Sequence, residues 1–177
     1  MNKKLGLSFV TLAALLVASC TPTPTAQAEF EVIPMPNQIS LAAGESPFVL
    51  FSGTAIYYTS GNADMERNAQ FLASYINDQL GYNLKVNAGT SDKGIVLSLK
   101  DGDAESEAYT INVNENKVLV EATSPAGIFY GVQTLRKSIP VEKDAVVAIP
   151  AGKIEDAPRF SYRGAHFDVC RNFFPVD

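Results

Sequence analysis

The chain has 177 residues, of which 46% are hydrophobic, and a formal net charge of −5 at pH 7. This length is enough for one domain and part of a second. The acidic balance argues against nucleic acid and anionic lipid as partners, because both carry negative charge. With two cysteines and one histidine, the chain offers neither a disulfide framework nor a Cys/His metal cluster. We therefore expect no metal and no other cofactor.

The first nineteen residues have the layout of a secretory signal peptide. Two lysines precede an apolar stretch, Leu5 to Val17, that is too short to span a bilayer permanently. Small residues then precede Cys20, as in a bacterial lipobox, where the cysteine is lipidated and becomes the mature N-terminus. We expect an exported lipoprotein, held on a membrane by its lipid and facing the periplasm or the cell surface. An ordinary signal peptide cut near Ala26 or Ala28 is the alternative.

Residues 20–29 are predicted to form an extended tether, because a run rich in threonine and proline follows the cysteine. Removal of residues 1–19 takes away two lysines and no acids. The mature chain then has 12 basic and 19 acidic residues, and its net charge is −7.

Between residues 30 and 140 the hydrophobic pattern alternates between the period of strands and the period of helices. A sheet of four or more strands with two helices on one face would bury both apolar helix stripes, so we expect an α+β domain. The predicted strands are 48–51, 54–58, 84–86, 95–99, 109–113 and 117–121, and the predicted helices are 63–80 and 125 to 136 or 137.

Residues at the ends of both predicted helices agree with this assignment. Asn62 or Asp64 is suited to cap the first helix, and Gly81 stands where helices commonly end. The second helix follows a serine cap and a proline at its first position. Gly127 and Gly131 lack side chains, so we expect another element to approach this helix closely.

Residues 101–107 carry four acidic side chains at alternate positions, a spacing reminiscent of a calcium loop. The glycine and terminal glutamate of such loops are missing at the required offsets, which favours a solvated loop. No phosphate loop, zinc-protease motif or nucleophile elbow occurs in the sequence. Residues 141–155 are predicted to be a linker, with one short strand possible at 146–149.

The last segment has the most distinctive sequence. It contains Asp156-Ala157-Pro158-Arg159-Phe160, then Arg163-Gly164, Phe167-Asp168, Arg171 and Phe173-Phe174. This pattern resembles the start of the catalytic barrel of glycoside hydrolase family 20, the β-N-acetylhexosaminidases. The preceding domain is similar to the small α+β domain before that barrel, and residues 127–135 are similar to its closing helix. The resemblance covers about residues 30–177.

The resemblance implies that residues 156–177 begin an incomplete (β/α)8, or TIM, barrel. Gly164 to Val169 would be its first strand, and Arg171 would lie just past the strand's C-terminal end, where such barrels bind substrate. The matching arginine in the family hydrogen-bonds hydroxyls of the terminal sugar, a role that suits the planar guanidinium. A salt bridge between Arg171 and a neighbouring loop is the alternative.

The neighbouring residues receive structural roles. Arg163 is expected to hold the bottom of the barrel, and Asp168 to pair with another strand. Orientation of Arg171 is the alternative role for Asp168. His166 and Cys170 are expected to pack inside the barrel. Asn172 departs from the family, which commonly has histidine there, and an amide cannot titrate near neutral pH.

Family members remove terminal N-acetylglucosamine or N-acetylgalactosamine with retained configuration, using the substrate's own acetamido oxygen as nucleophile. The family's catalytic Asp-Glu pair belongs to a later strand, and this sequence contains no tryptophan for the cage around the acetamido group. The sequence therefore predicts a fragment of such an enzyme, acting on glycans only as part of the whole, with no catalytic residue in the chain. A non-catalytic lipoprotein that binds glycans or a partner is the alternative. A zinc peptidase of similar small-domain topology is disfavoured because no zinc-ligand set exists.

Overall fold

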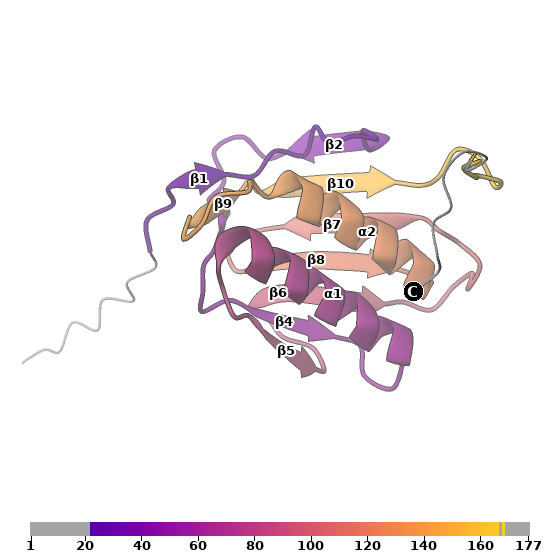
Figure 1. Cartoon of the computed structure of the whole chain (residues 1–177), viewed down its shortest axis with the longest axis horizontal. Helices are drawn as coiled ribbons and strands as arrows, with labels where there is room; N and C mark the ends of the chain where they lie inside the picture. Colours follow the sequence, from indigo (N-terminus) through magenta and orange to yellow (C-terminus); the bar gives the residue numbers. More distant parts are fainter. Residues whose placement is uncertain (1–21, 167, 169–177) are drawn as a thin grey trace, which may run out of the picture.

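Ten strands and two helices make up the part of the chain described by the computed structural model, residues 22–166 and 168 (Figure 1). Their bounds are β1 (Ala26–Gln27), β2 (Gln38–Leu41), β3 (Phe48–Leu50), β4 (Ala55–Tyr58), α1 (Ala63–Leu80), β5 (Lys85–Ala88), β6 (Gly94–Leu99), β7 (Tyr109–Val113), β8 (Lys117–Ala122), α2 (Pro125–Ser138), β9 (Val147–Ile149) and β10 (Gly152–Asp156).

Seven of these strands form one sheet, in the order β2-β10-β7-β8-β6-β4-β5. Strands β5, β4, β6 and β8 are neighbours in this order and pair in parallel. The pairs β8–β7, β7–β10 and β10–β2 are antiparallel. Strands β1, β9 and β3 form a separate small sheet. Both helices cover the same face of the large sheet (Figure 1). The expected α+β arrangement, with two helices on one face, is confirmed.

The helix ends follow the expected chemistry. The side-chain oxygen of Asn62 accepts hydrogen bonds from the backbone N–H groups of Asp64 and Met65, at 2.9 and 3.3 Å. Gly81 ends α1 with φ of 76°, a left-handed conformation that glycine adopts without steric cost. Ser124 caps α2 by accepting a bond from Gly127 N–H at 3.0 Å. Both helices therefore begin at the residues that the sequence predicts.

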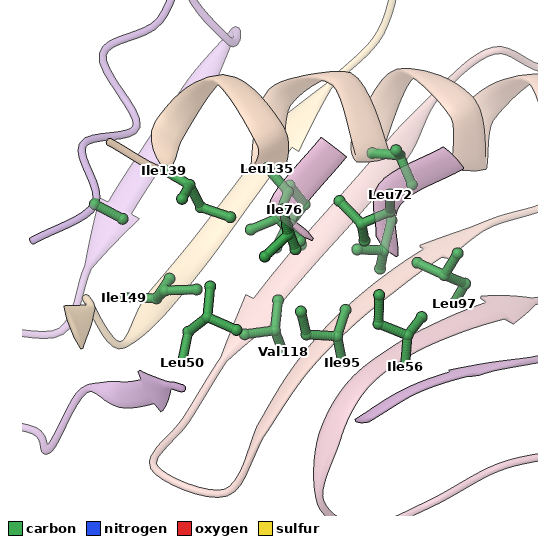
Figure 2. Packing of buried hydrophobic residues seen from close by; sticks show 14 of the residues in the cluster. Leu50, Ile56, Leu72, Ile76, Ile95, Leu97, Val118, Leu135, Ile139 and Ile149 are labelled. Atoms are coloured by element: carbon green, nitrogen blue, oxygen red, sulfur yellow. The ribbon is translucent and has the colours of Figure 1, made fainter. Parts of the chain in front are cut away.

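The core lies between the helices and the sheet (Figure 2). Leu72 and Ile76 of α1 and Leu135 of α2 point toward the sheet, and all three side chains have no exposed surface. Each such buried side chain contributes roughly 1.5–3 kcal/mol through the hydrophobic effect. Facing them are Leu50, Ile56, Ile95, Leu97, Val118 and Ile149.

The structure differs from the sequence expectation at the two ends of the domain. The expected linker, 141–155, contains β9 and most of β10, and β10 pairs with both β2 and β7. Ile154 of β10 is fully buried, whereas its neighbours Lys153 and Glu155 are not. The expected tether, 20–29, contributes β1, which pairs with β9. These pairings join residues at least 39 positions apart, so no local pattern shows them.

The expected first barrel strand, 164–169, is only partly described. Residues 164–166 are not in a strand, and residues 167 and 169 lie outside the described part. The barrel therefore stays a prediction. Across residues 22–166 and 168, neither helix combines the length and the apolar character needed to cross a membrane.

Helix α2 packs closely against its neighbours at Gly127, so we expect a larger residue there to lower the unfolding free energy. A Cβ on Gly127 would lie 2.5 Å from the backbone oxygen of Ala108, which cannot move without shifting its loop. Gly127→Ala gains up to about 1 kcal/mol of helix propensity, but the overlap costs roughly 1–3 kcal/mol. We expect a net loss of unfolding free energy in urea titration. Ala126→Ser, at the exposed neighbouring position, is the control, and a stabilised Gly127→Ala variant would contradict the prediction.

Candidate functional site

Most of the predicted site residues lie outside the described part of the chain. These include Cys20, expected to be lipidated, and Arg171, expected to bind the sugar, together with Cys170 and Asn172. The roles of these four residues stay predictions. His166 is described and exposed, so the packing expected for it is not formed by the described residues. Within the same part of the chain, no group of three or more His, Cys, Asp or Glu side chains is placed to hold a metal ion.

The structure places a cavity of about 430 Å³ where the chain leaves the sheet. One wall is the N-terminal segment around Pro34, a second is α2, and the third is the segment that follows β10. Its lining is formed by Val32, Pro34, Met35, Asn37, Tyr109, Tyr130, Gln133, Thr134, Lys137, Asp156, Ala157, Pro158, Arg159 and Arg163.

A hydrogen-bonded chain of three side chains forms one side of this cavity. The Tyr109 hydroxyl lies 2.6 Å from Thr134 Oγ1 and donates to Asp156 Oδ2 at 3.0 Å. A carboxylate can only accept hydrogen bonds, so the Tyr109 hydroxyl is the donor to Asp156. The Thr134 hydroxyl can then donate a hydrogen bond to the oxygen of Tyr109. These hydrogen bonds thus join β7, α2 and the end of β10.

Burial raises the pKa of Tyr109 above its ordinary value, and the negative charge of Asp156 adds to this effect. The hydroxyl therefore stays protonated at neutral pH and acts as a donor. Tyr109 is 3% exposed, which suits a structural bond better than proton transfer to a ligand.

Asp156 also ties the N-terminal segment to the end of β10. Its Oδ1 accepts a hydrogen bond from the backbone N–H of Asn37 at 3.2 Å. The Asn37 side chain in turn donates to the carbonyl oxygen of Ala157 at 3.0 Å. These bonds join residues about 120 positions apart and hold two walls of the cavity together.

Arg163 is bound to the α+β domain, which the sequence reading did not predict. Its Nη2 donates to Glu107 Oε2 at 2.7 Å and to the Tyr130 hydroxyl at 3.1 Å. The guanidinium also lies 5.6 Å from the centre of the Tyr130 ring. Among the described contacts, Arg163 therefore serves the domain that precedes the expected barrel. We call this group the Arg163 clasp: Arg163, Glu107 and Tyr130.

The clasp changes the expectation that residues 101–107 form a purely solvated acidic loop. Glu107, the last acid of that run, pairs with Arg163 instead of standing alone in solvent. Both charged side chains are about one-third exposed (39% and 32%), so water screens the ion pair and its direct contribution to stability is small. The pair instead fixes the position of the segment after β10 against the α+β domain. Sequence reasoning missed the pair because 56 residues separate its members.

The chemistry available in this cavity is limited. Asp156 is the one carboxylate among the residues that line it, and two hydrogen bonds already engage its oxygens. Glycoside hydrolysis needs a group that protonates the leaving oxygen, whereas both oxygens of Asp156 accept hydrogen bonds from other segments of the chain. The residues that line this cavity therefore form a structural junction, in which Asp156 holds segments of the chain together.

Comparison with known proteins assigns the chain to a family. The sequence model of glycosyl hydrolase family 20, domain 2, matches residues 29–157, well over half of the chain. The chain belongs to glycosyl hydrolase family 20. The matched range runs from the residues before the cavity to the end of β10, so it contains most of the junction just described.

Curated relatives carry hexosaminidase names. A beta-N-acetylhexosaminidase from Cellulomonas fimi is 32% identical over 149 residues, which cover 82% of this chain and 30% of that protein. A beta-hexosaminidase from Porphyromonas gingivalis is 27% identical over 155 residues, which cover 82% of this chain and 19% of that protein.

Solved structures agree with these relatives. The family 20 beta-N-acetylhexosaminidase from Streptomyces coelicolor is 34% identical with a TM-score of 0.70, covering 86% of this chain and 31% of that one. A Streptomyces plicatus beta-hexosaminidase in complex with its product GlcNAc is 32% identical with a TM-score of 0.69, covering 86% and 30%. This family 20 chain therefore spans less than a third of the length of these four relatives.

The raised pKa of Tyr109 predicts how stability depends on pH. The pKa of Tyr109 is higher in the folded state than in the unfolded state. The contribution of its protonated hydroxyl to the unfolding free energy is therefore complete below about pH 10 and is lost as pH rises further. Tyr109→Phe should lower the unfolding free energy at neutral pH by about 1–2 kcal/mol, since Asp156 and Thr134 lose a partner. It should also flatten the alkaline decline, measured by thermal unfolding over a pH series.

The control is Tyr162→Phe, because Tyr162 is 89% exposed. If Tyr109→Phe and the parent chain lost stability equally above about pH 10, the assigned role of Tyr109 would be wrong.

Proposed function

We propose that this chain is the accessory domain and the start of the catalytic domain of a retaining, substrate-assisted β-N-acetylhexosaminidase. The whole enzyme would remove terminal N-acetylglucosamine or N-acetylgalactosamine from glycans. The observation that carries the proposal is the family 20 match over residues 29–157, together with the hexosaminidase names of the relatives.

Within this proposal, the described residues support catalysis without performing it. The cavity offers one engaged carboxylate, and the relatives extend well beyond the portion that this chain covers. We therefore propose that the 177-residue chain does not hydrolyse glycosides by itself. Arg171 is proposed to bind hydroxyls of the terminal sugar once the rest of the catalytic domain surrounds it.

A chimera tests the proposal. Residues 22–177 replace the matching portion of the Streptomyces coelicolor enzyme, which has the same fold at 34% identity. We expect the chimera to hydrolyse a fluorogenic N-acetyl-β-glucosaminide, because an accessory domain of this family supports its catalytic domain. The isolated chain should show no turnover.

The matched control is the Streptomyces enzyme with the same portion deleted. A chimera no more active than this deletion would contradict the proposed function. Saturable heat on titrating the isolated chain with chitobiose would instead favour the non-catalytic glycan-binding protein.

We also propose that the chain is exported and anchored through lipidated Cys20, on the strength of the signal-like sequence before it. In a bacterial host fed an alkyne-labelled fatty acid, the full chain should acquire the label and fractionate with membranes. Cys20→Ser should lose the label, whereas the control Cys170→Ser should keep it. A mature N-terminus at residues 26–28 in the parent chain would sink this proposal in favour of ordinary signal cleavage.

A further inference from the structure

The chain is fixed to the folded domain at Thr25, five positions after Cys20. The backbone N–H of Thr25 donates to the carbonyl oxygen of Val146 at 2.8 Å, and the Thr25 hydroxyl accepts from the backbone N–H of Val146 at 3.1 Å. Strand β1 then pairs with β9, and Ala28 is 1% exposed. The tether expected over residues 20–29 is therefore limited to the residues before Thr25.

The end of the domain at Thr25 is built from segments that lie far apart in the sequence. The loop that follows α2 packs on the C-terminal end of α1, where the backbone N–H of Asp144 donates to the carbonyl oxygen of Leu80 at 2.8 Å. The Tyr82 hydroxyl donates to the carbonyl oxygen of Ala145 in the same loop. We call this end the anchor pole: Thr25, residues 80–82 and residues 140–146.

We propose that the anchor pole lies against the headgroups of the bilayer that holds the lipid of Cys20, and that the end of β10 faces away from this bilayer. The inference rests on the proposed lipidation of Cys20. It does not depend on the proposed hydrolase activity.

Covalent geometry limits the distance between the anchor pole and the membrane. A fully extended chain covers at most about 3.6 Å per residue, so five steps place Thr25 within about 18 Å of Cys20. A lipidated residue stays at the membrane surface, because its acyl chains are buried in the bilayer. Pro22 and Pro24 favour a stiff, extended tether that does not fold back. The pole therefore stays close to the headgroups.

The chain continues from the opposite end of the domain. Strands β8 and β10 both run antiparallel to β7, and β4 and β6 run parallel to β8, so these four strands end at the same edge of the sheet (Figure 1). Helix α1 returns from that edge to the anchor pole, and its 18 residues separate the two ends by about 27 Å. Residues after Asp156 therefore start at the end that is remote from the lipid.

The surface chemistry of the anchor pole fits zwitterionic headgroups. Val141 is an apolar side chain that is 79% exposed. Glu142 and Asp144 are exposed beside it, and the ammonium group of Lys143 already donates to the carbonyl oxygen of Asp78 at 2.6 Å. Both helices also end here, which adds partial negative charge. Anionic headgroups would be repelled, whereas phosphatidylcholine would not.

Quenching by spin labels on lipid headgroups tests this orientation. The full chain with Cys170→Ser is lipidated in a bacterial host and reconstituted into phosphatidylcholine vesicles. A fluorophore is attached at Val141→Cys on the anchor pole, or at Ala104→Cys in the exposed loop between β6 and β7 at the opposite end. Quenching at residue 141 should exceed that at residue 104 by at least about threefold, because about 27 Å separates the two ends.

A longer tether is the matched control. An insertion of about twenty Gly/Ser residues between Thr23 and Pro24 adds a root-mean-square reach of about 25 Å. It should lower the quenching at residue 141 to the level at residue 104. A fluorophore at Asn87→Cys reports whether the domain lies on its sheet, because Asn87 is exposed on edge strand β5. We expect weaker quenching there than at residue 141.

The outcomes separate the orientation from the lipidation. Equal quenching at residues 104 and 141 of the lipidated chain, or the strongest quenching at residue 87, would overturn the orientation while the lipidation stood. Stronger quenching at residue 141 in vesicles of phosphatidylglycerol would overturn the assignment to zwitterionic headgroups. A purified chain without lipid, as judged by its mass, would overturn the proposed anchoring and this inference together.

Discussion

The insertion of β10 between β2 and β7 is the constraint on which the rest of the architecture depends. It joins the N-terminal segment to the hairpin of β7 and β8, and it brings Asp156 beside Tyr109 and Asn37. Without this strand, the edge of β7 would be unpaired and Ile154 would leave the core. Folding of the sheet and placement of the departing chain are therefore one event.

The geometry at this junction connects stability to function. Asp156 holds the start of the departing segment, and the Arg163 clasp holds its far end against α2. A segment fixed at both ends gives whatever follows it a defined position relative to the helices. Under the proposed function, the domain would act as a rigid support that orients the catalytic portion.

Local chemistry made much of the fold predictable. Period and caps predict both helices and the neighbouring strands β7 and β8, because the interactions that form them lie within a few residues. The same reasoning failed for β1 and β10, whose partners are distant in sequence and whose own segments are short. At the site, the sequence pointed to the segment after Asp156 as important, but it did not predict that Arg163 contacts Glu107 and Tyr130 of the α+β domain.

The sequence by itself determined the helices, most of the strands, the amphipathic faces that require a two-layer fold, and the resemblance to family 20. Each of these depends on residue types at short, fixed spacings. Only the tertiary structure decided the strand order, the bonds of Asp156 and the partners of Arg163. Those features join residues up to 120 positions apart, and such pairings exist only after the core has fixed where each element lies.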